Sequence, residues 1–186
     1  AQVGGTYPGA SYGTNVTLST PRYINGDFTV SGGKTLTLTG GGVFFVAGKF
    51  TMSGGGTVFN SGIIAADGII TISGGGGYNN TGDPTTSGIF GFAANSKAIV
   101  LSGGSSAPLH GVAYTPNGGI ELSGGSNWTG MLISGGAGTL GKITMSGGSR
   151  ITYPAGFFGT LKALPALPPL PHTSTTVVTL TGRREL

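Results

Sequence analysis

The sequence has no cysteine and very few charged residues. None of its 186 residues is Cys, and only 8% are Asp, Glu, Lys or Arg, against about 25% in an ordinary globular domain. Disulfides and thiolate metal sites are therefore excluded. The basic residues that give the net charge of +4 are scattered singly, apart from Arg183 and Arg184, whereas nucleic-acid binding needs a clustered basic surface. We expect no nucleic-acid partner.

Acidic residues and histidines are too few to suggest catalysis. The chain has five acids and two histidines. Asp27 and Asp67 lie in comparable turns with Lys49 between them, which favours a solvated column of turns over the facing carboxylate pair that glycoside hydrolysis needs. His110 and His172 have no acidic or thiolate neighbours from which a zinc site or a Ser-His-Asp triad could be built. We expect no enzymatic activity, no metal and no cofactor.

Long apolar runs and helix-forming windows are also missing. No stretch of 18 apolar residues is present, so the sequence predicts no membrane span. No ten-residue window combines helical apolar spacing with freedom from Gly and Pro, which predicts an all-β fold. What the chain has in abundance is glycine, at 40 residues.

The glycines belong to a repeated phrase, which begins as Phe28-Thr29-Val30-Ser31-Gly32-Gly33. It returns with conservative changes at residues 50–55, 70–75, 99–104, 120–125 and 143–148. The serines of successive copies are 20 to 29 residues apart, which is the spacing of a solenoid. The segment Val16-Thr17-Leu18-Ser19 looks like a degenerate first copy.

Each copy alternates apolar and other residues, the two-residue period of a strand with one buried face. The Ser-Gly-Gly that follows predicts a corner, because glycine adopts positive φ without steric cost. We expect these pairs to point inward: Phe28 and Val30, Phe50 and Met52, Ile70 and Ile72, Ile99 and Leu101, Ile120 and Leu122, Ile143 and Met145. We expect an outward row of Thr29, Thr51, Thr71, Val100, Glu121 and Thr144.

A second recurring strand precedes each polar turn, at residues 42–46, 62–66, 88–93, 111–114 and 130–133. A third strand is expected only sometimes, as at residues 36–38. The pattern predicts a single-stranded parallel β-helix, or β-solenoid, of about seven coils. We expect residues 1–15 to form a lead-in or cap, residues 16–162 the solenoid, and residues 163–186 a Pro-rich spacer with a C-terminal strand. Residues 74–84 are expected to be an inserted loop.

The end of the chain departs from the repeat. Phe157, Phe158 and Leu161 are expected to close the far end of the core. Residues 163–171 form an apolar, polyproline-like spacer, and a β-branched segment follows it. A tethered strand of this kind can pair with the next molecule by strand addition, and a head-to-tail contact generates a filament. The expected assembly interface comprises Thr175, Thr176, Val177, Val178, Thr179, Leu180 and Thr181.

Other readings remain open at this point. The terminal strand can instead dock within its own subunit. The outward threonines can recognise a regular surface such as ice or polysaccharide, which would make the chain a binding module. A polysaccharide-degrading enzyme on the same fold is a third reading, but it lacks a carboxylate pair. Glycosylation sequons occur at Asn15, Asn79 and Asn127.

Three segments carry a resemblance to a known family. Residues 23–32, 62–74 and 111–124 resemble the uncharacterised β-helix domain of prokaryotic surface proteins associated with pilus and Tad-type secretion operons. The resemblance covers roughly residues 8–155, and it implies a right-handed β-helix at the cell surface without assigning any residue a role. The Pro-rich tail is not part of that pattern, which favours a free-standing subunit that forms a homopolymer. The start at Ala1-Gln2-Val3 suits cleavage of a signal peptide, so we expect a secreted protein, extracellular or on the cell surface.

Overall fold

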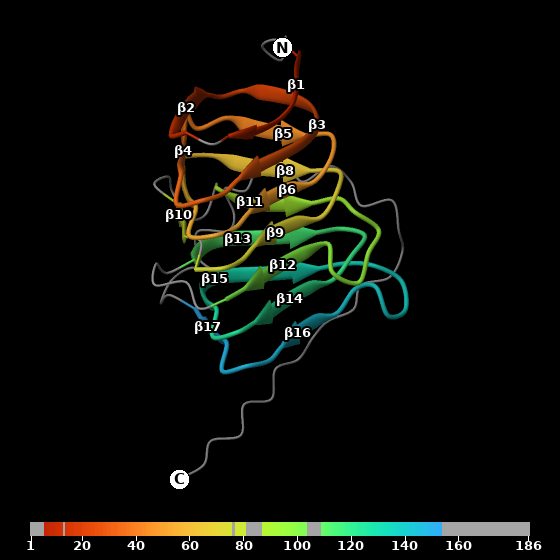
Figure 1. Ribbon diagram of the computed structural model, residues 1–186. Coiled ribbons are helices and arrows are strands. Elements are labelled where there is room, and N and C mark those ends of the chain that lie inside the picture. Colours follow the sequence, from red (N-terminus) through yellow and green to blue (C-terminus); the bar gives the residue numbers. More distant parts are fainter. Residues whose placement is uncertain (1–5, 13, 76, 81–86, 104–108, 154–186) are drawn as a thin grey trace.

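The computed structural model describes residues 6–12, 14–75, 77–80, 87–103 and 109–153, and within these ranges the chain contains β-strands and no helix (Figure 1). The strands are β1 (Thr6–Tyr12), β2 (Val16–Ser19), β3 (Arg22–Val30), β4 (Thr35–Thr39), β5 (Val43–Val46), β6 (Phe50–Met52), β7 (Thr57–Asn60), β8 (Ile63–Ala66), β9 (Ile70–Ile72), β10 (Gly77–Asn80), β11 (Gly88–Gly91), β12 (Ile99–Ser102), β13 (Leu109–Thr115), β14 (Ile120–Ser123), β15 (Asn127–Ser134), β16 (Ile143–Met145) and β17 (Arg150–Thr152).

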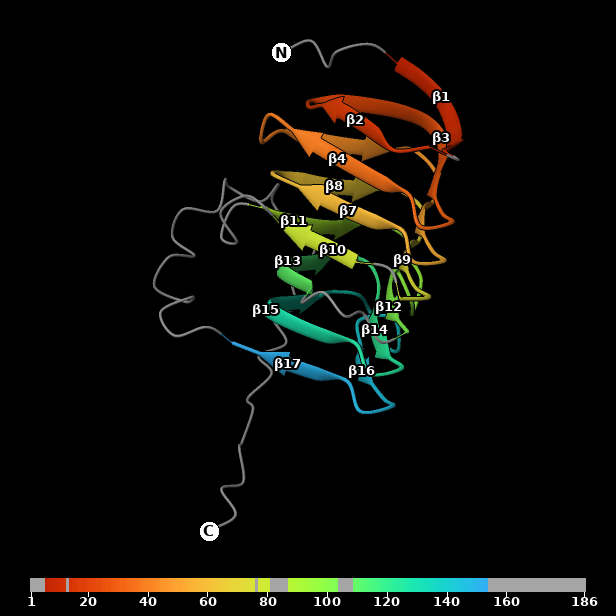
Figure 2. The same ribbon diagram turned by 60° about the vertical axis from the view of Figure 1, so that its left-hand side comes forward.

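The strands stack as a parallel β-solenoid with three faces. The first face contains residues 28–30 of β3 and then β6, β9, β12, β14 and β16, in that order. The second contains β2, β4, β7 and β10, and the first halves of β13 and β15 and strand β17 continue it (Figure 2). The third contains residues 22–24 of β3, then β5, β8, β11 and the second halves of β13 and β15. All these pairs are parallel, so the expected solenoid is confirmed.

The number of coils and their composition differ from the expectation. The first face has six strands from β3 to β16, which makes about five turns, and seven coils are not confirmed. One reason is Val16–Ser19, which pairs with β4 on the second face and does not precede Phe28 on the first. The third strand, which was expected only in some coils, occurs in every described coil and forms the second face. Residues 77–80 of the expected loop form one of these strands, β10.

Glycine corners keep the coils in register. Gly32 and Gly33 have φ of 66° and 70°, and the glycine pairs of the later described copies lie in the same region. Two consecutive positive φ values are the signature of a type I′ turn. The corners also bond to each other, since the Gly33 N–H donates to the Gly54 carbonyl oxygen at 2.9 Å. The hydrogen-bond ladder between coils therefore continues around the corner.

The expected inward columns are confirmed over most of the stack. Phe28 pairs with Phe50 and Phe50 with Ile70, and all three are fully buried. The rings of Phe28 and Phe50 stack with centroids 6.0 Å apart. Ile143 and Met145 are the exception: they keep the register of Ile120 and Leu122 but are each 42% exposed. They belong to the last described coil, and no described strand lies beneath them.

Two other expectations concern the ends of the chain. Part of the lead-in, β1, pairs in parallel with β3. Phe157, Phe158, Leu161 and the whole segment 163–186 lie outside the described residues.

Replacing Ile70 with Asp tests the column assignment. The change buries an unpaired carboxyl group among apolar side chains, and we expect the free energy of unfolding to fall by roughly 3 to 5 kcal/mol. Thr71→Asp is the matched control, because Thr71 is next to Ile70 in the same strand but faces outward. This variant should lose less than about 1 kcal/mol of the free energy of unfolding. Urea unfolding followed by circular dichroism measures both. Equal losses for the two variants would contradict the assignment.

Candidate functional site

The outward threonines form a straight row on the first face. Thr29, Thr51 and Thr71 pair in register in successive strands, and all are partly exposed. The row continues as Val100, Glu121 and Thr144, so the expected register is confirmed. Its polar character is interrupted at Val100, and a salt bridge of 2.7 Å joins Glu121 to Lys97.

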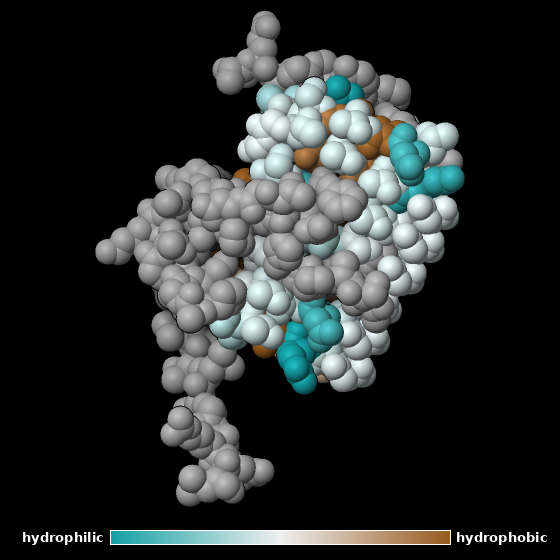
Figure 3. Space-filling view, turned by 90° about the vertical axis from the view of Figure 1, so that its left-hand side faces the viewer, coloured by the Kyte–Doolittle hydropathy of each residue, from teal (hydrophilic) through white to brown (hydrophobic). Residues whose placement is uncertain are grey.

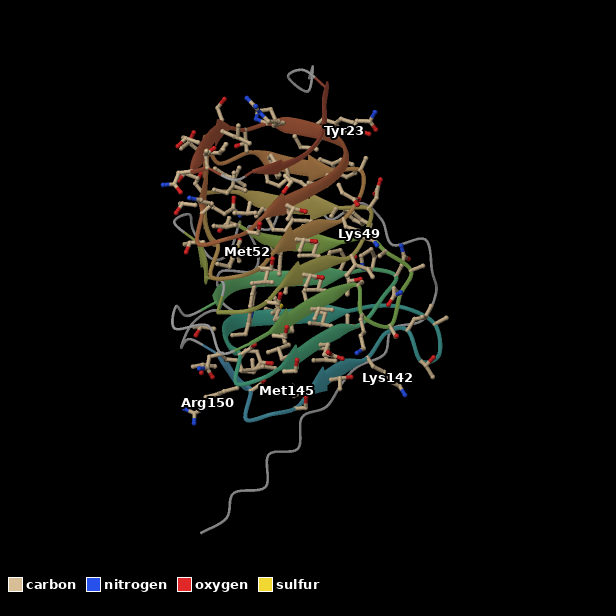
Figure 4. The ribbon with its side chains drawn as sticks, viewed as in Figure 1. Tyr23, Lys49, Met52, Lys142, Met145 and Arg150 are labelled. Atoms are coloured by element: carbon tan, nitrogen blue, oxygen red, sulfur yellow. The ribbon has the colours of Figure 1, made fainter. Side chains whose placement is uncertain are left out.

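Within the part of the chain that the structure describes, the stack ends at β16 and β17. β16 pairs only with β14 and β17 only with β15 among the described strands. Each therefore presents one edge without a strand partner, and such edges are templates for further pairing. Ile143, Met145 and Tyr153 are exposed here, and Figure 4 shows Met145 and Arg150 at this end. Apolar side chains and an unpaired edge therefore coincide.

The opposite end has a matching pattern of residues. β1 places Ala10, Ser11 and Tyr12 at the register positions of Phe28, Thr29 and Val30. On the second face, β2 begins with Val16, which packs against the core, and Thr17, which is exposed. The edge strands β1 and β2 thus have the same alternation of apolar and polar residues as the strands β3 and β4 with which they pair.

The third face is apolar on its outer side as well as on its inner side. Tyr23 stacks on Phe45 with centroids 5.4 Å apart, and Phe90 meets Tyr114 edge to face at 5.5 Å. In register, the outward positions form two columns: Val43, Ile63, Gly88, Val112 and Met131, and Tyr23, Phe45, Ala65, Phe90, Tyr114 and Ile133. Sequence reasoning identified these strands as apolar but missed this surface. The available signal was the unbroken apolar run 43–46, in which every second residue must face outward.

Two shallow hollows lie near the first coils. One, of about 340 Å³, is on the third face and is lined by Pro21, Arg22, Tyr23, Val43 and Phe45. The other, of about 510 Å³, is at the start of the threonine row, where Ser11, Asp27 and Thr29 line it together with Gly9 and Gly26.

The second face is mainly threonine, serine and glycine outside. Figure 3 looks onto this side, and most of the described surface near the first coils has the pale colour of these residues. Thr17 and Thr39 are exposed there, and Thr37 is half-buried.

Two of the acidic residues, Asp27 and Glu121, have a hydrogen-bond or ion-pair partner. Asp67 lies in an exposed turn after β8, whereas Asp27 is exposed within β3 and not in a turn as expected, and Lys49 lies in the coil between them. The Asp27 Oδ1 accepts a hydrogen bond from the Lys49 backbone N–H at 2.8 Å. No cluster of three His, Asp or Glu side chains able to hold a metal occurs among the described residues. Within the same part of the chain, no helix is long and apolar enough to cross a membrane.

The remaining candidate residues fall in different places. Thr175, Thr176, Val177, Val178, Thr179, Leu180 and Thr181 lie outside the described residues, as do Asp83, His172 and Glu185. Asn15 and Asn127 are exposed, and the Asn15 Oδ1 accepts a hydrogen bond from the Thr35 N–H at 3.0 Å. Asn79 belongs to β10 and His110 to β13, and only their backbones are described.

One buried polar cluster lies inside the second face. The Asn60 Nδ2 donates to the Gly62 carbonyl oxygen at 2.5 Å and to the Tyr78 hydroxyl oxygen at 2.9 Å. The Asn60 Oδ1 accepts from the Gly62 N–H, so the amide fixes the corner after β7. Burial raises the pKa of Tyr78 well above its ordinary value, although the hydrogen bond from Asn60 opposes part of this shift. Burial also raises the pKa of Tyr114.

Comparison of the chain with protein-family models, curated proteins and solved structures finds no match. The resemblance to the β-helix domain of pilus-associated surface proteins therefore stays a prediction.

The buried phenol of Tyr78 makes stability sensitive to alkaline pH. The unfolded tyrosine ionises near pH 10 while the folded one stays neutral, so stability is complete below pH 10 and falls by about 1.4 kcal/mol per pH unit above it. Tyr78→Phe should remove part of this slope and cost about 1 kcal/mol at neutral pH. Val58→Ala, in the same column, should weaken the fold but keep the slope. Urea unfolding between pH 8 and pH 11 checks this, and an unchanged slope in Tyr78→Phe would contradict it.

Proposed function

We propose that this chain is the structural subunit of an extracellular, cell-surface filament, assembled head to tail as a homopolymer. The observation that carries the proposal is the open end of the solenoid, where Ile143 and Met145 continue buried columns and yet are exposed. An apolar end with unpaired strand edges is satisfied by another layer of the same stack.

The two ends are complementary in residue pattern. On the first face, Ile143, Thr144 and Met145 would be followed in register by Ala10, Ser11 and Tyr12 of the next subunit. On the second face, Ile151 and Thr152 would be followed by Val16 and Thr17. Ile151 and Val16 each pack against the core of their own coil. A head-to-tail junction therefore sets apolar positions against apolar positions and threonine or serine against threonine.

Several finer features belong to the same proposal. The segment 175–181 would strengthen the junction by strand addition, in which backbone hydrogen bonds supply affinity. The right-handed winding and the location at the cell surface rest on the family resemblance. The proposed assembly needs only self-association and calls for no cofactor or metal.

A second candidate is a binding module for polysaccharide or ice. The hollow lined by Ser11, Asp27 and Thr29 supports it, because hydroxyl and carboxylate groups at the start of a regular threonine row suit a hydroxylated surface. Val100 and Glu121 break the row halfway, which leaves Thr29, Thr51 and Thr71 as its regular part.

Met145→Asp tests the filament. Wild-type protein should form thin fibres with an axial repeat of roughly 34 Å, from seven layers, β1 included, at about 4.8 Å each. A carboxylate at the junction would be buried without a partner, so the critical concentration should rise at least about tenfold. Thr51→Asp, on the side of the stack, is the matched control and should assemble as the wild type does. Negative-stain microscopy and pelleting measure both. Absence of fibres from the wild type, or normal fibres from Met145→Asp, would refute the proposal.

Thr51→Tyr tests the second candidate. If the row binds a regular surface, the bulky ring should reduce glycan-array binding or thermal hysteresis by about tenfold, while Thr37→Tyr on the second face should leave them unchanged. A wild-type protein without either activity removes this candidate.

A further inference from the structure

Among the described outward positions of the third face, the most exposed large apolar side chain lies in the first coils. Val43 is 40% exposed, and Tyr23 and Phe45 are partly exposed beside it. Further along the same outward columns, Val112 and Tyr114 are only 2% and 4% exposed, and they form a separate apolar cluster with neighbouring side chains. The hollow at Tyr23 and Phe45 therefore combines two partly exposed aromatic rings with the most exposed apolar side chain among the described outward positions of this face.

The hollow has the chemistry of a site for a proline-rich segment. Its floor is the stacked pair Tyr23 and Phe45, and Pro21 and Val43 complete an apolar lining. Grooves lined by aromatic rings bind extended proline-rich chains, since the polyproline II helix is preformed and loses little entropy on docking. The chain itself carries such a segment. Residues 163–171 read Ala-Leu-Pro-Ala-Leu-Pro-Pro-Leu-Pro, with four prolines and no charge.

The path of the chain favours the hollow of the next subunit. After β2, β4 and β7, the chain turns the same corner from the second face to the third. β17 ends at this corner in the last coil, and Tyr153 follows it. In a head-to-tail stack, the next β3 and β5 lie roughly two layers, or about 10 Å, further on. The subunit's own hollow lies about 25 Å away by layer spacing, beyond the part of the face already packed around Val112 and Tyr114.

The length of the segment is sufficient for this contact. Pro165 is 12 residues after Tyr153, which spans up to about 40 Å when extended. From these observations we propose that the third-face hollow of one subunit binds residues 163–171 of a second copy of the chain. The proposal rests on the head-to-tail filament and adds the segment that binds across the junction. In it, the proline-rich stretch is the ligand, and residues 175–181 would follow it beyond the junction.

Two full-length variants test this contact by complementation. Val43→Asp disables the hollow at an exposed position, and Leu167→Asp disables the proline-rich segment. Each alone should raise the critical concentration for fibres at least about tenfold, whereas Thr37→Asp on the second face should not. An equal mixture retains one intact hollow and one intact segment per pair, so it should give dimers but few fibres in analytical ultracentrifugation.

The outcomes separate this inference from the filament itself. Normal fibres from Val43→Asp would overturn the inference and leave the filament standing, whereas no fibres from the wild type would refute the filament. A direct measurement is independent of fibres: a synthetic peptide of residues 163–171, titrated into the Leu167→Asp protein, should shift the Val43 methyl resonances in NMR spectra. No shift overturns the contact. Wild-type Val43 resonances that already match the bound state at all dilutions would show docking within one subunit and overturn the assignment to a second copy.

Discussion

The backbone hydrogen-bond ladder between successive coils is the constraint on which the whole structure depends. It runs along the strands and also through the corners, where the Gly55 N–H donates to Gly74 and the Gly75 N–H donates to Gly103, both at 2.9 Å. A ladder without gaps requires every coil to follow the same backbone path. Each corner must then adopt the same positive φ values, which glycine reaches at least cost. The high glycine content follows from this requirement.

Much of the fold could be predicted from the sequence because the ladder converts a repeat into columns. Once residues follow the same path, equivalent positions stack. Phe28, Phe50 and Ile70 therefore had to share a column, and Thr29, Thr51 and Thr71 had to share the opposite side. The alternation of two residues decided which set faced inward. Neither inference needed any knowledge of which coils were neighbours beyond their order in the chain.

The repeat pattern does not indicate which face a short strand joins or which outward residues stay exposed. Val16–Ser19 has the residue alternation of the first-face strands but lies on the second face. The alternation in a four-residue strand does not indicate which of the three faces the strand belongs to. The glycine run at residues 74–77 suggested a loop, so β10 was not predicted. The run 43–46 predicts a strand but leaves open which outward residues stay exposed, because that depends on what packs against them. The same applies to the candidate interfaces: the open edge at β16 and the hollow at Tyr23 appear only when the coils are stacked.

The ends of the stack follow from the same constraint as its middle. Nothing within a ladder of identical steps specifies where it should stop, so termination requires a change in the chain. At the first coil, the change is β1, which lies along β3 and still keeps the alternation of the coils. At the last coil, Ile143 and Met145 retain the pattern of the interior and meet solvent. A surface that keeps the register of a buried layer is best satisfied by another copy of that layer. In the proposed filament a second copy of the chain would supply that layer, because its first strands carry the matching apolar and polar order. Assembly into a filament would thus extend the interaction that folds the subunit, and in such a filament the third-face hollow would lie about two layers past the junction.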